Sequence, residues 1–137
     1  WSQGPASWKK QFDKAMAKAP TPERGVREWA LFIGSDLARY LSNPAVIVRT
    51  EMPFLWRRNP TRCVEGMMDL AAYDSGTKKW LVIDWKTNLV APDRAHTLQT
   101  LYAPQISAYV EAIRSITEQE ARGALYSTAT GRVIDCS

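Results

Sequence analysis

Residues 66–87 read GMMDLAAYDSGTKKWLVIDWKT, which is two apolar segments separated by a cluster of turn residues. Aliphatic and aromatic residues dominate both segments, whereas DSGTK at 74–78 contains the residue types that favour turns. This pattern predicts a β-hairpin whose strands cover 62–73 and 79–87. Because side chains alternate along a strand, Asp84 and Lys86 share one face, and we expect Trp85 on the opposite face, in the core.

The predicted hairpin brings two aspartates together. A four-residue loop at 75–78 places Asp69 directly opposite Asp84, with Cβ atoms roughly 5 Å apart, whereas a two-residue loop at 75–76 leaves both on one face, placed diagonally. Facing carboxylates repel, and charges in apolar strands are costly to bury. Two carboxylates beside the Lys86 ammonium therefore predict a site for a hard cation such as Mg²⁺, where the lysine acts on water or phosphate. The structural alternative is an ion pair of Lys86 with one aspartate.

Hydrophobic periodicity in the rest of the chain predicts further elements. They are helices over 5–18, 22–42 and 97–117, and strands over 46–56, 123–129 and 132–136. This order predicts an α/β (mixed α+β) fold in which helices flank a central mixed sheet of about five strands. The 137 residues fit a single domain spanning 1–137, since a domain averages about 150 residues.

The composition restricts the classes of function. Eighteen basic and 14 acidic residues leave a net charge of +4, which favours a polyanionic partner. Two cysteines and a single histidine argue against a disulfide framework, a four-ligand zinc site and a Ser-His-Asp triad. No apolar run reaches the roughly 18 residues of a membrane helix, and the cysteine usage predicts a cytoplasmic protein.

Three motifs follow one another along the chain: GMMD at 66–69, DWKT at 84–87 and Q-x-x-x-Y at 105–109. In this order and spacing they resemble the PD-(D/E)XK nucleases. More narrowly, they resemble the RecB/AddA-type C-terminal nuclease domain of bacterial helicase–nucleases, which are exodeoxyribonuclease V-like. The stretches RTEMPF at 49–54 and LYAPQISAY at 101–109 are also similar to that branch. The resemblance implies a restriction-endonuclease-like core.

The resemblance also implies an activity and a set of site residues. The activity is Mg²⁺- or Mn²⁺-dependent hydrolysis of phosphodiester bonds by an (exo)deoxyribonuclease, within DNA repair or recombination. Asp69, Asp84 and Lys86 would form the catalytic set. Asp69 and Asp84 would bind the metal together with the backbone carbonyl of Trp85, and Lys86 would be the catalytic lysine.

Three further residues have both a functional and a structural interpretation. Gln105 and Tyr109 are four residues apart on one helix face, and the resemblance places them on the DNA side of the site. By themselves they would be an ordinary pair at the edge of the core. Glu51, on the first predicted strand, is equally compatible with an outer-shell metal contact and with a salt bridge.

The resemblance departs from the family pattern at one position. Members of the family usually carry a histidine on an early helix in a G-x-x-x-H setting, whereas the helices predicted over 5–18 and 22–42 contain none, and His96 does not match this motif. The alternatives are that this helix is lost or, as we expect, that it lies upstream, in a larger helicase–nuclease of which residues 1–137 are a fragment. The fragment alone would then be weakly active or inactive.

The expected partners follow from this context. They are DNA, the helicase domains of the parent chain and a second helicase–nuclease subunit, with no membrane. The alternative is a catalytically silent nuclease-fold module that serves DNA binding or scaffolding.

Overall fold

A computed structural model describes residues 4–18, 22–87 and 92–136 of the chain. Along the chain the elements are α1 (Pro5–Met16), α2 (Pro22–Ile33), α3 (Asp36–Leu41), β1 (Val46–Asn59), β2 (Arg62–Asp74), β3 (Lys79–Lys86), η1 (Pro92–Arg94), α4 (Ala95–Thr117), β4 (Ala121–Ser127) and β5 (Arg132–Asp135).

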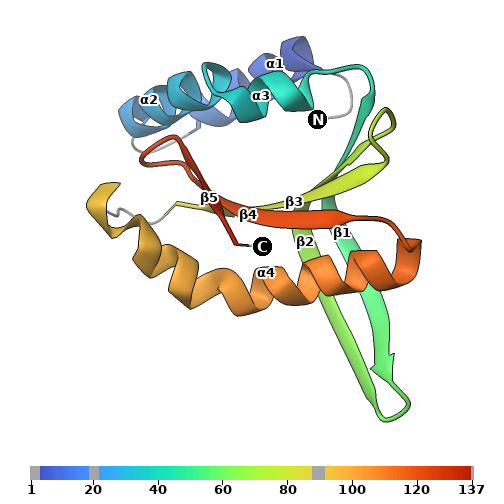
Figure 1. The fold of residues 1–137 in the computed structure, drawn as a ribbon. Coiled ribbons are helices and arrows are strands. Elements are labelled where there is room, and N and C mark those ends of the chain that lie inside the picture. Colours follow the sequence, from blue (N-terminus) through green and yellow to red (C-terminus); the bar gives the residue numbers. More distant parts are fainter. Residues whose placement is uncertain (1–3, 19–21, 88–91, 137) are drawn as a thin grey trace.

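The strands form one five-stranded sheet in the order β1-β2-β3-β4-β5. Strands β3 and β4 are parallel because α4 crosses over between them, and every other neighbouring pair is antiparallel. Figure 1 shows α1, α2 and α3 on one face of the sheet and α4 on the other. The predicted mixed sheet of about five strands flanked by helices is therefore confirmed.

The prediction of one helix over 22–42 is wrong, because the helix breaks at Gly34 and Ser35. Ser35 has extended backbone angles, and its Oγ accepts a hydrogen bond from the N–H of Ala38 at 3.1 Å. A serine that satisfies a free N–H in this way starts a new helix, so α3 begins at Asp36.

In the middle of β1 and of β2, the apolar side chains change from one side of the sheet to the other. We call this change the face exchange. Val48 and Leu70 pack beneath α1–α3, but Met52, four residues after Val48, and Met68, two residues before Leu70, pack on the α4 side. Alternation alone would keep each such pair on one face. The exchange coincides with Glu51, whose φ of +48° lies in the left-handed region that non-glycine residues rarely adopt.

Beyond this exchange, residues 52–68 form a two-stranded extension, which we call the arm. Within the described part of the chain the arm has no third strand beside it, because the β2–β3 pairing ends at Leu70 and Ile83. Figure 1 shows the arm leaving the sheet and passing beside α4. The arm and the site described below therefore begin at the same point of β2.

Two hydrophobic cores fill the space between the helices and the sheet. Trp85 lies in the core under α1–α3, where its ring meets those of Phe32 and Tyr126 edge to face at 5.7 and 5.2 Å between centroids. The predicted core position of Trp85 is confirmed.

No helix in the described ranges is long and apolar enough to cross a membrane.

Candidate active site

The site lies where β2 separates from β3. Their pairing runs from Asp74–Lys79 to Leu70–Ile83, so the loop has four residues and Asp69 and Asp84 are next in register, as predicted. The backbone ladder stops before them. Asp69 Oδ2 accepts a hydrogen bond from the N–H of Trp85 at 2.9 Å, so a side chain takes the place of a backbone carbonyl and the two strands diverge.

Asp69 borders a cavity of about 530 Å³ on the α1 side of the sheet, lined by Gln11, Thr50, Glu51, Asp69 and Trp85. The face exchange in β2 falls at Asp69, but the Asp69 carboxylate still meets that of Asp84, since the charge of Asp69 and a side-chain hydrogen bond with it raise the pKa of Asp84. Glu51 shares this cavity and forms no ion pair with any described residue, so the salt-bridge interpretation of Glu51 is wrong. Its outer-shell role stays a prediction.

Asp84 and Lys86 lie on the α4 side of β3, where they form a nearly buried ion pair. Lys86 Nζ is 2.5 Å from Asp84 Oδ2, and the two side chains are 15% and 6% exposed. The ammonium also lies 3.8 Å from the centroid of the Tyr102 ring, a cation–π contact that holds it against α4. The predicted structural alternative, an ion pair of Lys86 with one aspartate, is therefore present in the structure.

The environment of Asp84 disfavours its charged form. Burial is the largest cause and raises the pKa of Asp84 above its usual range, the hydrogen bond and charge of Lys86 lower it, and the neighbouring Asp69 carboxylate raises it again. The direction that prevails is upward. Asp84 Oδ2 is fully buried, and the Lys86 ammonium lies 2.5 Å from it.

The raised pKa predicts the effect of Asp84→Asn on folding without metal. A carboxyl whose folded pKa exceeds its unfolded value contributes most to stability below about pH 3.9, and this contribution is lost as the pH rises through the folded pKa. At pH 7 in EDTA, we expect Asp84→Asn to leave the free energy of unfolding unchanged or to increase it by up to about 1 kcal/mol. Urea unfolding of both proteins from pH 3 to pH 8 measures the difference.

The control for this measurement is Asp93→Asn, at an exposed position that takes no part in the ion pair. If Asp84→Asn lowers stability by more than about 1 kcal/mol at neutral pH and equal m-value, the ion pair outweighs the cost of burial. Asp84 would then be a structural residue.

Helix α4 brings the Q-x-x-x-Y pair to the same side of the sheet as Lys86. Gln105 is exposed, and its Nε2 donates a hydrogen bond to the Tyr109 hydroxyl at 2.7 Å. Tyr109 is only 8% exposed, and its ring packs edge to face on Phe54 at 5.4 Å. The structure therefore leaves Gln105 free to contact a ligand, with Tyr109 behind it as its support.

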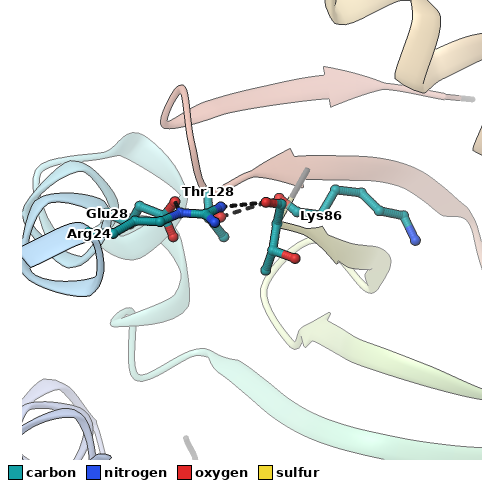
Figure 2. A network of polar contacts seen from close by, with 5 residues as sticks. Arg24, Glu28, Lys86 and Thr128 are labelled. Atoms are coloured by element: carbon teal, nitrogen blue, oxygen red, sulfur yellow. Dashed lines mark hydrogen bonds and ion pairs between the residues drawn. The ribbon is translucent and has the colours of Figure 1, made fainter. Parts of the chain in front are cut away.

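The carboxyl end of β3 is anchored from two elements. Thr128 donates to the backbone carbonyl of Lys86 from its N–H at 3.0 Å and from its Oγ1 at 3.3 Å. Arg24 Nη2 donates to the Thr87 carbonyl at 2.5 Å, and Arg24 Nε is held by Glu28 at 2.7 Å. Figure 2 shows the Lys86 side chain pointing away from this network, which therefore fixes the backbone of Lys86 without contacting its ammonium.

Sequence reasoning missed three residues of this neighbourhood. Tyr102 carried a usable signal, because it lies three residues before Gln105 on one helix face. Gln11 and Arg24 carried none, since their helices approach the strands only in the tertiary structure.

The described residues fit a hard divalent cation held partly by its substrate. No group of three or more His, Cys, Asp or Glu side chains in the described ranges is arranged to hold a metal ion. However, two carboxylates suffice for Mg²⁺, which keeps several waters and takes further ligands from phosphate oxygens. The carboxylates of the buried Asp84 and of Asp69, which borders the cavity, are acceptors of this kind.

Comparison with protein-family models matches residues 6–133 to the PD-(D/E)XK nuclease superfamily. A comparison with curated proteins gave no match. The matched range contains both aspartates, the lysine and the Q-x-x-x-Y pair, and the mixed sheet flanked by helices agrees with a restriction-endonuclease-like fold. The chain belongs to the PD-(D/E)XK nuclease superfamily.

Proposed function

We propose that this chain is the nuclease domain of a RecB/AddA-type helicase–nuclease and hydrolyses phosphodiester bonds in DNA with Mg²⁺ or Mn²⁺. The observation that carries the proposal is the meeting of Asp69, Asp84 and Lys86 at the point where β2 leaves β3. If the site consisted of Asp84 and Lys86 alone, their ion pair would explain why both charged side chains are nearly buried. A second carboxylate beside the buried Asp84 is not explained by folding, because the two like charges repel and the charge of Asp69 raises the pKa of Asp84.

Asp69 and Asp84 are the side chains that would hold the metal, with the backbone carbonyl of Trp85 as a third ligand. A bound divalent cation supplies polarisation of a phosphoryl oxygen and a lower pKa of bound water. Asp69 is already oriented for such a role, since the N–H of Trp85 holds one of its oxygens. This hydrogen bond also ties the Asp69 side chain to the backbone that carries the proposed third ligand.

Lys86 would act on the phosphate or on the attacking water. Its ammonium has three donors, and the Tyr102 ring and the Asp84 carboxylate hold it in place. A positive charge fixed in a largely water-excluded site stabilises negative charge that develops on a phosphate far more than a solvated lysine would. Gln105, exposed on α4, would contact the DNA strand nearby.

The test uses metal binding and cleavage as separate measurements. Because the protein supplies few ligands, we expect weak, millimolar binding of Mn²⁺. At a concentration ten times the dissociation constant, the free energy of unfolding should rise by about 1.4 kcal/mol, and the melting temperature by roughly 3–5 °C. Asp69→Asn and Asp84→Asn should each lose most of this shift, while Glu65→Gln, an exposed carboxylate on the arm, should retain it.

Cleavage of single- and double-stranded DNA is then followed with Mn²⁺ and with EDTA. We expect metal-dependent product from this chain or from the longer protein we propose for it, and none from Asp84→Asn. Full metal binding with no cleavage in either form would leave the silent DNA-binding module as the function. No thermal shift with millimolar Mn²⁺ would argue against an intact site.

A further inference from the structure

We propose that one side of α1 binds the phosphate backbone of the DNA strand beside the active site. This side, which we call the cavity side of α1, is formed by Ser7, Gln11, Lys14 and Lys18. The inference rests on the proposed function, since it names where the substrate of that site continues. Lys14 and Lys18 are the residues that we assign to phosphate contacts.

Helix α1 and the turn after it hold most of the excess positive charge of the chain. Residues 5–18 contain four lysines and one aspartate, which gives +3, whereas the whole chain has a net charge of +4. All four lysines are exposed. A concentration of basic residues on one exposed helix is the electrostatic pattern of a surface that contacts a polyanion.

The packing of α1 determines which of its sides borders the site. Trp8 is buried in the core under α1–α3, and Phe12 stacks on Trp29 at 4.6 Å between ring centroids, so these side chains face the protein. Gln11 lines the cavity that Asp69 borders. Gln11 therefore marks the side of α1 that lies next to the site.

Lys14 and Lys18 lie on the same side of α1 as Gln11. Positions three and four residues apart share a helix face, and Lys14 and Lys18 follow Gln11 at these intervals. The N–H of Lys18 donates to the Ala15 carbonyl at 3.2 Å, so the chain continues to coil as far as Lys18. Ser7 belongs to this side too, because its Oγ accepts a hydrogen bond from Gln11 Nε2 at 3.2 Å.

The lysines on the two sides of α1 differ in their partners. Lys9 lies two residues before Gln11, about 160° away around the helix, and forms an ion pair with Asp13. Lys14 and Lys18 form no ion pair with any described residue. Exposed ammonium groups without a carboxylate partner are suited to bind phosphate oxygens as point charges.

The acidity of the site explains why a bound strand needs positive charge beside it. Glu51 and Asp69 both line the cavity, and such carboxylates suit a metal ion but repel the other phosphates of the strand. The positive charge of Lys86, on the α4 side, is already paired with Asp84. On the α1 side, Lys14 and Lys18 supply cations next to the cavity.

The length of the cavity side fits the phosphates nearest to the site. Seven residues separate Gln11 from Lys18, which is about 11 Å of helix at 1.5 Å per residue. A DNA strand in a duplex has about one phosphate per 3.4 Å, so this length corresponds to about three phosphates. With Gln105 on the α4 side, the proposed strand crosses the sheet where β2 leaves β3.

The experiment measures DNA binding without cleavage. Fluorescence anisotropy in EDTA follows a labelled 12-mer, single-stranded and duplex, across a salt series. The test protein is Lys14→Gln/Lys18→Gln. The matched control is Lys9→Gln/Lys79→Gln, which removes the same charge from two exposed lysines that are paired with Asp13 and Glu120.

A second variant separates charge from helix stability. Lysines near the C-terminus of a helix also favour the helix dipole, so their loss can destabilise α1. Lys14→Arg/Lys18→Arg keeps both charges and should bind DNA as the unmodified chain does. Melting temperatures of all the proteins are measured beside binding.

We expect the test protein to bind the 12-mer about tenfold more weakly. The slope of log K against log salt should fall by about 1.8 for duplex DNA, or about 1.4 for a single strand, because two phosphate contacts are removed. The control should change binding much less. The proposal would be overturned by equal losses in test and control proteins, by no loss in the test protein, by no recovery with arginine, or by an unmodified chain that binds no DNA.

The outcome is independent of the metal and cleavage measurements. Loss of DNA binding in the test protein, in a chain that binds no Mn²⁺, would support the cavity side of α1 and reject the nuclease proposal. Metal-dependent cleavage with unchanged DNA binding in the test protein would do the reverse.

Discussion

Replacing Lys86 with alanine should lower DNA cleavage by at least about 100-fold, whether cleavage is measured in this chain or in the longer protein that we propose for it. The ammonium contacts the Asp84 carboxylate, and Asp84 and Tyr102 hold it in one position. Removing it takes away a charge fixed beside the reacting phosphate. Single-turnover cleavage at saturating Mn²⁺ measures the loss in the chemical step.

Metal binding by Lys86→Ala should stay the same or become tighter. Lys86 Nζ contacts the buried Asp84 oxygen that we assign to the metal, so the lysine and the cation compete for one carboxylate in the resting chain. Calorimetric titration with Mn²⁺ tests this separation of binding from chemistry. The control is Lys79→Ala, which removes the same charge from an exposed ion pair with Glu120. Undiminished cleavage by Lys86→Ala would end its catalytic assignment.

Gly123→Ala should lower the free energy of unfolding by about 1–3 kcal/mol. Strand β4 approaches α4 so closely here that a Cβ would lie 2.2 Å from Ile106 Cγ2 and 2.8 Å from Val110 Cγ2. Both methyls belong to buried β-branched residues, which cannot move aside without shifting the helix. Urea unfolding with a common m-value measures the effect.

The control for this substitution is Gly34→Ala, since a Cβ there meets backbone atoms only at 3.5 Å or more. Because α4 also carries Tyr102, a displaced helix should weaken the contact that holds Lys86, so Gly123→Ala should reduce cleavage as well as stability. Equal stabilities of Gly123→Ala and Gly34→Ala would contradict the close packing of β4 on α4.

Several features of the fold could be predicted because they depend on local chemistry. The turn residues between two apolar runs predicted the hairpin and two possible loop lengths, and the structure has the four-residue loop at 75–78, which brings Asp69 next to Asp84. The helix boundary at Ser35 was missed although it is also local, because the apolar pattern continues through it and hides the capping serine. Periodicity reports which face is apolar, not whether one helix or two present it.

The sequence by itself determined the candidate residues of the site, since Asp69, Asp84 and Lys86 are identified by their types and spacing. Only the tertiary structure decided how they are arranged. Glu51 has a left-handed backbone, and the side chains of β2 change sides of the sheet at Asp69. Regular alternation therefore does not predict the position of Asp69, which borders the cavity on the α1 side. Alternation is a property of one regular strand, whereas this exchange depends on packing the arm against α4, a helix that follows much later in the chain.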